Sequence, residues 1–483
     1  MLAYNGRGAI RSREKSMRKK YDVIIIGAGP AGIFCALELA RSSSEKVLVI
    51  EKGKSIDREC PAPYGQCRKC KPCNTLSGWG GAGAFSDGKL TLSSDVGGWL
   101  RELIPRSKVD RLIEKVDRTY LEFGAPARVF GDDEEKVQEI GREAIKHELL
   151  LIPSKVRHMG TEVCPVVMSR MKEELERKAD IMLETEVERI VIKDGSLKGV
   201  ALAGGGELQC RYLVVAPGRS GADWFSNVSR DLGLKREGNM VDIGVRVEVP
   251  GVITAPLTDV LYEPKLVYYS KPSEDRVRTF CMNPWGEVIK EYYEEVLTVN
   301  GHSYAEKRTE NTNFALLVDK QFTEPFREPI AYGQYIAHLA NLLGDGILVQ
   351  RLGDLQAGRR STPKRIRRGT VTPTLGDATP GDLSLVLPFR FLTAILEMLS
   401  ALDKLVPGVN SRNTLLYGVE VKFYSSRMRV GPSLESEIPN LFGAGDGVGI
   451  TRGLVQASAS GLLVADSIMR REKRVQPQRD AGA

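Results

Sequence analysis

The hydrophobic positions near the start of the chain predict one strand–turn–helix–strand unit. Residues 23–26 form a continuous β-branched run, which is typical of a parallel strand buried on both faces. A glycine turn follows at 27–32, then a stretch of helical character at 33–41 and a second buried strand at 46–50. This order predicts a βαβ unit.

The hydrophobic pattern changes its period after residue 180. From Asp180 to Arg219, alternating apolar and polar positions are separated by turn residues at 194–195 and 204–206. We therefore expect a β-meander that ends in the apolar strand 212–216. Residues 440–469 return to a strand, a glycine turn and a helix.

These patterns predict an α/β protein in which a Rossmann-like nucleotide-binding domain is interrupted by a mixed α+β substrate domain. The predicted parts are a basic leader (1–20), the discontinuous nucleotide-binding domain (21–95, 150–225 and 431–470), a helical insertion (96–149), the substrate domain (226–430) and a tail (471–483).

Composition narrows the classes of function. The chain has 483 residues, 42% of them hydrophobic, and a formal net charge of +7 that is concentrated in the leader and the tail. Basic runs at chain ends are usually solvated, and no aromatic pattern accompanies them, so we do not expect nucleic-acid binding. No apolar stretch approaches the ~20 residues of a membrane span. We expect a cytoplasmic protein whose eight cysteines are thiols, metal ligands or redox groups.

The glycine turn carries a dinucleotide-binding fingerprint, Gly27-x-Gly29-x-x-Gly32. The first glycine permits the tight turn, the second lets the backbone approach a pyrophosphate, and the third lets helix and strand pack closely. Glu51, at the end of the next strand, is placed to accept from a ribose hydroxyl. Pro30 and Ala31 between the glycines, and Lys52 after Glu51, belong to the same predicted site.

Three further segments favour FAD over NAD. Residues 211–218 resemble the strand-to-glycine motif that closes over FAD in two-dinucleotide-binding-type flavoproteins, and 441–446 resemble the motif that delivers an aspartate to the ribityl chain. A helix beginning at 453 would aim its first amides at the flavin. The residues that we assign to FAD in and near these segments are Val187, Ala216, Gly218, Gly445, Asp446, Gly453, Leu454 and Val455. No second fingerprint is found, so the reductant would be diffusing NAD(P)H, an electron-transfer protein or the substrate itself.

A glycine-rich block at 78–90 (GWGGAGAFSDGKL) carries a family resemblance. With segments at 157–162, 280–284, 301–304 and 311–315, it is similar to uncharacterised FAD-dependent dehydrogenases of the glutathione-reductase-like NAD(P)/FAD-dependent oxidoreductase superfamily. The resemblance extends from residue 21 to about 469. It implies the fold and FAD, and names no substrate. A backbone without bulky side chains can pass close to the cofactor, so we place these residues beside it: Gly81, Ala82, Gly83, Ser86 and Lys89.

Four cysteines precede this block: Cys60, Cys67, Cys70 and Cys73. Three hypotheses fit them. They would hold a [4Fe–4S] cluster that passes electrons to the flavin, a structural zinc ion, or a redox-active dithiol. The remote cysteine precedes the triplet, which departs from ferredoxin spacing. Free thiols with packing roles are the fourth alternative.

Candidate catalytic groups are His302, His158, Tyr304 and Cys281. The two histidines lie in glycine-containing segments, where they would serve as proton donors near the flavin or as ordinary turn residues. The basic cluster 358–368 is a candidate site for an anionic substrate tail, or else a solvated loop. The sequence thus predicts an FAD-dependent oxidoreductase that moves a hydride between flavin and an organic substrate. The alternative is an electron-transfer or redox-sensing flavoprotein that acts on a protein partner.

Overall fold

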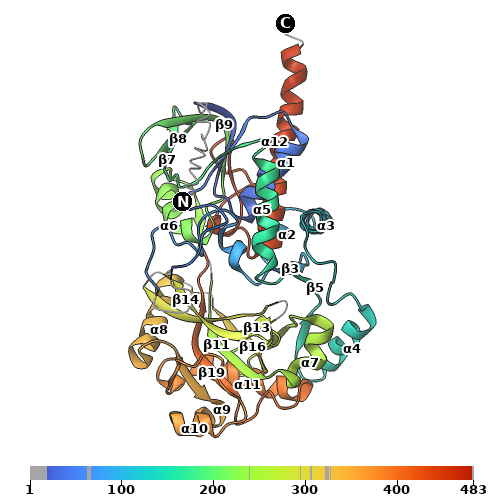
Figure 1. The fold of residues 1–483 in the computed structure, drawn as a ribbon, viewed down its shortest axis with the longest axis vertical. Helices are drawn as coiled ribbons and strands as arrows, with labels where there is room; N and C mark the ends of the chain where they lie inside the picture. The colour runs from blue at the N-terminus through green and yellow to red at the C-terminus, as the bar shows by residue number, and fades with distance from the viewer. Residues whose placement is uncertain are drawn as a thin grey trace, which may run out of the picture.

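The computed structural model describes residues 19–61, 67–238, 240–293, 295–304, 307–320, 322, 326 and 328–480, with side chains up to 473. Most of the predicted basic leader lies outside the described residues. The protein is elongated, with two parts built on two sheets (Figure 1). Within the described residues, no helix is both long enough and apolar enough to cross a membrane.

The first part is built on a seven-stranded sheet. Its strands in spatial order are β6 (Asp180–Met182), β2 (Val47–Ile50), β1 (Lys20–Ile26), β9 (Glu207–Val215), β8 (Ser196–Leu202) and β7 (Val187–Lys193), and β21 (Leu441–Gly443) pairs with β9. Strands β6, β2, β1, β9 and β21 run parallel, so their carboxyl ends meet at one edge of the sheet. Ligands of open α/β sheets bind at this edge. The predicted Rossmann-like fold is confirmed.

Two helices from opposite ends of the chain pack together in the first part. They are α1 (Pro30–Ser42) and α12 (Leu454–Asp480). A side chain at Gly461 of α12 would clash with the carbonyl of Ala31 in α1, so this position admits glycine for close helix packing. The C-terminal segment therefore completes the core that the N-terminal segment begins.

The second part is built on an eight-stranded sheet. Its strands in spatial order are β18 (Thr379–Pro380), β17 (Leu348–Arg351), β19 (Leu415–Lys422), β11 (Val241–Pro250), β16 (Asn311–Lys320), β13 (Arg276–Asn283), β12 (Lys265–Tyr269) and β4 (Leu150–Ile152). Alternate residues of β11 point to opposite faces. The valines and isoleucine of β11 join an apolar core with α8 (Pro329–Gly344) and α11 (Phe389–Leu405). The opposite face carries Asp242, Arg246 and Glu248, all buried.

A hairpin lies over this polar face. It consists of β14 (Glu287–Tyr293) and β15 (Val296–His302), and it is bonded to the sheet through Arg246 with Asn300 and through Lys422 with Glu291. In Figure 1, β14 lies at the upper side of the second part, facing the first. The hairpin and the polar face therefore border the junction between the two parts.

The predicted helical insertion is divided between the two parts. Helix α3 (Arg106–Glu122) packs on α12, whereas α4 (Glu134–Ile145) packs on β4. Strand β4 pairs with β12, so residues 150–152 lie in the second sheet and not in the nucleotide-binding sheet. Leu149 and Leu151 both pack against the apolar core of the second part, which explains why β4 joins the second sheet.

The remaining elements connect and cover the two sheets. They are β3 (Lys89–Leu92), β5 (Lys155–His158), α2 (Leu100–Leu103), α5 (Val163–Leu175), α6 (Ala222–Asp231), β10 (Arg236–Glu237), α7 (Gly251–Leu261), α9 (Leu352–Gln356), α10 (Pro363–Arg367) and β20 (Arg427–Met428), with 3-10 turns η1 (Gly81–Phe85), η2 (Arg219–Gly221), η3 (Leu383–Leu385) and η4 (Asp446–Val448). Strands β10 and β20 pair with each other where the chain crosses between the two parts.

Candidate functional site

The fingerprint turn follows β1 at the carboxyl edge of the first sheet. Gly27 has φ = 101°, and a side chain there would clash with the carbonyl of Ala216, so only glycine fits. A Cβ at Gly29 would meet nothing within 4 Å. Gly29 is the N-cap of α1 and supplies no side-chain cap, which leaves the first amides of the helix for a ligand. The turn therefore offers open space and N–H donors for a pyrophosphate.

Glu51 joins three loops at this edge. Its carboxylate accepts hydrogen bonds from the backbone nitrogens of Ala28 (2.9 Å), Gly53 (2.8 Å) and Gly78 (2.8 Å), and the residue is 6% exposed. A carboxylate has about four acceptor positions, so one remains for a ribose hydroxyl. Glu51 both assembles the site and can bind the cofactor.

A pocket opens beside Glu51, with about 400 Å³ of empty space that includes the part open to solvent. Its lining includes Gly27, Glu51, Lys52, Val187, Pro217 and Trp224. The ammonium of Lys52 donates to the carbonyl of Ser220 (2.8 Å), so it holds the pocket wall in place.

The glycine block crosses the fingerprint turn. The backbone nitrogen of Gly80 donates to the carbonyl of Ala28 (2.7 Å), and a Cβ at Gly81 would lie 3.2 Å from Cα of Gly29. A Cβ at Gly83 would lie 2.6 Å from the side chain of Leu454, the first residue of α12. Fingerprint, glycine block and the start of α12 therefore converge.

Asp446 closes the same site from the C-terminal segment. Its carboxylate accepts from the hydroxyl of Thr451 (2.8 Å) and from the nitrogen of Gly453 (3.1 Å). Burial raises the pKa of Asp446, and these hydrogen bonds oppose the rise. Side chains at Gly218 and Gly453 would meet nothing within 4 Å, as at Gly29. These open glycines, one from each of three segments, form a cradle that fits FAD.

Lys89, after the glycine block, reaches into the second part. Its ammonium is 2.6 Å from Oδ2 of Asp87, 2.6 Å from Oδ1 of Asn283 and 3.7 Å from Sγ of Cys281. Burial is the largest effect on Lys89 and opposes its charge, but Asp87 and the other acidic groups around it together outweigh burial and raise the pKa of the ammonium. Burial likewise acts against the charge of Asp87, and Lys89 holds the pKa of this carboxyl below its usual value. The segment after the glycine block is thus linked to the end of β13 by the hydrogen bond from Lys89 to Asn283, and Asp87 balances the charge of Lys89.

His158, at the end of β5, belongs to the same cluster. The hydroxyl of Tyr262 is 2.9 Å from Nδ1 of His158 and donates to Oγ of Ser303 at 3.0 Å. The rings of Tyr262 and His158 stack with their centroids 4.5 Å apart. Burial lowers the pKa of His158 to about 4, so the imidazole is neutral at pH 7.

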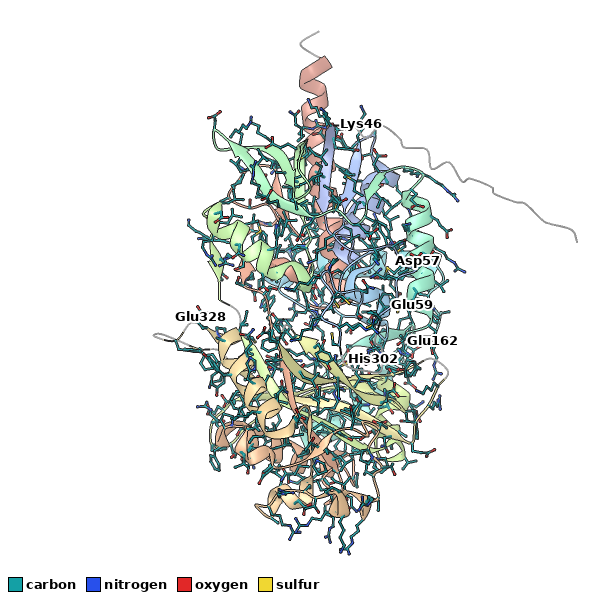
Figure 2. The ribbon with its side chains drawn as sticks, turned by 60° about the vertical axis from the view of Figure 1, so that its left-hand side comes forward. Lys46, Asp57, Glu59, Glu162, His302 and Glu328 are labelled. Carbon is teal, nitrogen blue, oxygen red and sulfur yellow. The ribbon has the colours of Figure 1, made fainter. Side chains whose placement is uncertain are left out.

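His302 lies at the end of β15, at the junction between the two parts (Figure 2). Within the described part of the chain its imidazole makes no hydrogen bond. Burial lowers its pKa, although Asp87 partly opposes this effect. His302 is therefore a neutral imidazole whose nitrogen atoms have no hydrogen-bond partner among the described residues, which suits a proton acceptor.

Other predicted residues have local partners. The hydroxyl of Tyr304 donates to Glu287 (2.6 Å), and its ring centroid is 6.5 Å from that of His302. The hydroxyl of Ser86 donates to the carbonyl of Gly83 (2.9 Å), so it shapes the glycine block. The structure groups His158, His302 and Cys281 around the Asp87–Lys89 pair, while Tyr304 faces the hairpin.

A buried ion pair lies between the polar face of the second sheet and the hairpin. The guanidinium of Arg246 makes two hydrogen bonds to Glu420, at 2.7 and 2.8 Å, and both side chains are 0% exposed. It also donates to the carbonyl of Cys281 (2.8 Å) and to Asn300 (3.0 Å). Arg246 thereby fixes the end of β13 against the hairpin.

The four cysteines of the predicted cluster are half-buried and form no disulfide. Among the described residues, no set of three or more histidine, cysteine or acidic side chains is arranged to hold a metal, and metal binding here stays a prediction. Arg58 ties this loop to the glycine block: it donates to the carbonyls of Asn74 (2.7 Å), Trp79 (2.8 Å) and Gly81 (3.3 Å).

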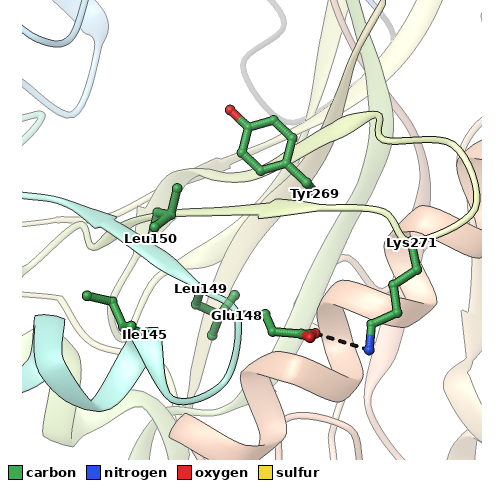
Figure 3. Close-up of a pocket in the computed structure, with 6 residues that line it drawn as sticks. All are labelled: Ile145, Glu148, Leu149, Leu150, Tyr269 and Lys271. Atoms are coloured by element: carbon green, nitrogen blue, oxygen red, sulfur yellow. Dashed lines mark ion pairs between the residues drawn. The ribbon is translucent and has the colours of Figure 1, made fainter.

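Two other features lie away from the cradle. The basic cluster 358–368 surrounds α10, at the end of the molecule opposite the nucleotide-binding sheet (Figure 1), so it does not face the junction. An open hollow at β4 and β12 has mainly apolar walls and one exposed ion pair, Glu148 with Lys271 at 3.2 Å (Figure 3). Asp87, Lys89, His158 and His302 are not among the residues that line it.

Sequence reasoning missed several residues of the junction: Asp87, Tyr262, Asn283, Arg219, Glu291 and Lys422. Three of them had a usable signal. Asp87 belongs to the glycine-rich block at 78–90. Arg219 directly follows the glycine motif of the meander, and Asn283 belongs to a segment that carried the family resemblance.

The fold and the cradle define an FAD-dependent oxidoreductase with a Rossmann-like domain. The sequence agrees: residues 22–59 match the family described as FAD binding domain, and residues 260–423 match the family described as FAD-dependent protein, C-terminal domain-like. An uncharacterised protein of Clostridium beijerinckii is 30% identical over 474 aligned positions, and the match covers 92% of this chain and 80% of that protein. The chain belongs to the family of this protein, a family of FAD-dependent proteins.

Solved structures with a similar arrangement include two enzymes. Glycine oxidase from Geobacillus kaustophilus is 14% identical, with a TM-score of 0.39 over 93% of this chain and 95% of that chain. L-proline dehydrogenase from P. horikoshii is 14% identical, with a TM-score of 0.41 over 94% of each chain.

Proposed function

We propose that this protein oxidises or reduces a small organic substrate at the junction between its two parts. When bound, FAD would supply the two-electron chemistry by exchanging a hydride with a substrate carbon. The observation that carries the proposal is the position of Lys89. Its chain segment packs on the cofactor cradle, and its ammonium contacts Asn283 and Cys281 of the substrate domain.

The chain's own residues would handle the proton. His302 is neutral and makes no hydrogen bond within the described residues, so it can take a proton from a substrate hydroxyl or amine. Asp87 lies close enough to stabilise the imidazolium that results, although Lys89 partly opposes this effect. His158 is already engaged by Tyr262, and it would position Ser303 and this wall of the site.

The test uses the FAD-loaded full chain without oxygen. The protein should show a flavin absorption spectrum, and a screen of NADH, NADPH, amino acids and hydroxy acids should find a reductant that bleaches it. His302→Gln should slow that reduction while FAD stays bound, and His338→Gln, on exposed α8, is the matched control. An unchanged rate in His302→Gln would reject the role of this histidine.

The cysteine loop would connect this site to an electron carrier. Arg58 links the loop to Gly81 of the cradle, which favours a relay through a [4Fe–4S] cluster or a dithiol over a remote structural site. Iron and zinc analysis of protein purified without oxygen separates these cases. Iron would support a cluster, zinc a structural ion, and neither metal a dithiol or free thiols.

A further inference from the structure

We propose that the substrate of this site carries a carboxylate group, and that Arg219 binds it. This inference rests on the proposed function, because it places the substrate at the junction beside the cradle. Arg219 begins η2, directly after the open glycine Gly218. A Cβ on Gly447 would clash with Gly218, so this turn packs against the segment that carries Asp446. Arg219 therefore lies where the meander and the C-terminal flavin motif meet.

The guanidinium of Arg219 has donors to spare. Its closest charged partner is Oε1 of Glu291, at 3.6 Å, and within the described residues it makes no hydrogen bond. Its side chain is 45% exposed. A guanidinium carries five N–H donors in a planar fork that matches a carboxylate. Arg219 is thus a half-exposed cation whose donors are accessible to a ligand.

The other charged groups of the junction are already paired. Lys422 is 3.0 Å from Oε2 of Glu291 and 3.2 Å from Oε1 of Glu420. Arg246 makes two hydrogen bonds to Glu420. Direct contacts thus match Arg246 and Lys422 to Glu420 and Glu291. Arg219 is the third cation of this group; it also interacts electrostatically with Asp446, but its guanidinium makes no hydrogen bond within the described residues.

The pairing also argues against a substrate that binds only through an amine. Oε2 of Glu291 accepts from Lys422 and from Asn300 (3.1 Å), and Asp87 is paired with Lys89. Lys422 and Arg219 hold the pKa of Glu291 at about 2 despite its burial, so this carboxylate stays ionised and bound to cations. Glu291 and Asp87 are thus each paired with a cation, whereas the guanidinium of Arg219 makes no hydrogen bond within the described residues.

The probes are two acids and their amides of the same shape: benzoate with benzamide, and succinate with succinamide. They are titrated into the FAD-loaded full chain, and the flavin difference spectrum is recorded. At least one acid should perturb the spectrum with saturation, and its amide should bind at least about tenfold more weakly. Arg219→Gln should weaken binding of the acid at least about tenfold, and Arg219→Lys should give an intermediate loss because it keeps the charge but not the fork.

The matched control is Arg189→Gln, which removes an exposed arginine of β7 that also has one carboxylate partner. It should bind the acid as the natural chain does. The inference is overturned if acid and amide bind equally, if Arg219→Gln binds the acid like the natural chain, or if neither acid perturbs the spectrum. A chain that takes up no FAD would instead refute the proposed function, so the two failures are distinguishable.

Discussion

The hydroxyl of Tyr262 lies 2.9 Å from Nδ1 of His158, and the rings of the two residues stack on each other. The two residues are 104 positions apart in the sequence. His158 ends β5, which pairs with β3, and Tyr262 directly follows α7. This contact fixes one wall of the junction beside Lys89.

Replacing Tyr262 with phenylalanine should keep the stacked ring and remove only the hydrogen bonds to His158 and Ser303. We expect FAD to remain bound and flavin reduction to slow by about 10- to 100-fold, because the wall of the site loses its fixed geometry. Anaerobic stopped-flow absorbance measures this rate. Tyr335→Phe, on the exposed surface of α8, is the matched control. An unchanged rate in Tyr262→Phe would show that this contact does not serve the reaction.

Acid should destabilise the fold through His158. Burial holds its pKa at about 4 in the folded chain, whereas an exposed histidine has a pKa of 6.5, so the unfolded chain binds more protons between these values. The free energy of unfolding therefore falls as pH falls from 6.5 to 4, by up to about 3 kcal/mol from this residue. Urea unfolding across this range should show a shallower pH slope in His158→Gln than in the natural chain. Equal slopes would contradict the assigned pKa.

Two glycines of the fingerprint should respond in opposite ways to serine. Gly29 is an N-cap with open space around it, so Gly29→Ser should leave the stability of the FAD-free chain unchanged or raise it by about 0.5 kcal/mol. The same side chain should obstruct the pyrophosphate and weaken FAD binding at least about tenfold.

Gly32→Ser is the comparison variant. A side chain there would clash with the carbonyl of Gly27, so the fold itself should lose about 1–3 kcal/mol. Thermal unfolding with and without FAD, together with FAD titration, measures both effects. The account of the cradle fails if Gly29→Ser binds FAD as tightly as the natural chain.

Removing one partner of the buried Arg246–Glu420 pair should lower the free energy of unfolding strongly. Glu420→Gln leaves a fully buried guanidinium without its counter-charge, and we expect a loss of about 3–5 kcal/mol in the free energy of unfolding. Glu207→Gln, which breaks the exposed pair with Arg189, should cost less than about 1 kcal/mol. Similar losses in the two variants, measured by urea unfolding, would contradict the burial of the first pair.

The parts of the fold that the sequence predicts are those with a long or repeated pattern. Strand β1, helix α1 and the meander carry continuous apolar runs or strict alternation, and the structure contains them within a few residues of the predicted bounds. Strand β4 has three residues, too few for a pattern to show which sheet it joins. The predicted boundary at residue 150 therefore differs from the structure.

The candidate site likewise has one part that the sequence predicts and one part that it does not. The glycines and Glu51 are local motifs, and each is placed by the strand that precedes it, so the sequence alone indicates the cofactor. The junction depends on contacts between distant segments: Lys89 and Asn283 are 194 positions apart. No spacing rule connects them. The sequence singled out Lys89, His158, Cys281 and His302, but only the structure shows that they meet.

A crystal structure of the FAD-loaded chain tests the central claim most directly. The account predicts that the flavin ring contacts the glycine block and the start of α12, with one side turned toward Lys89 and His302 at the junction. A ring that faces bulk solvent, or a cofactor bound away from the fingerprint turn, would contradict it.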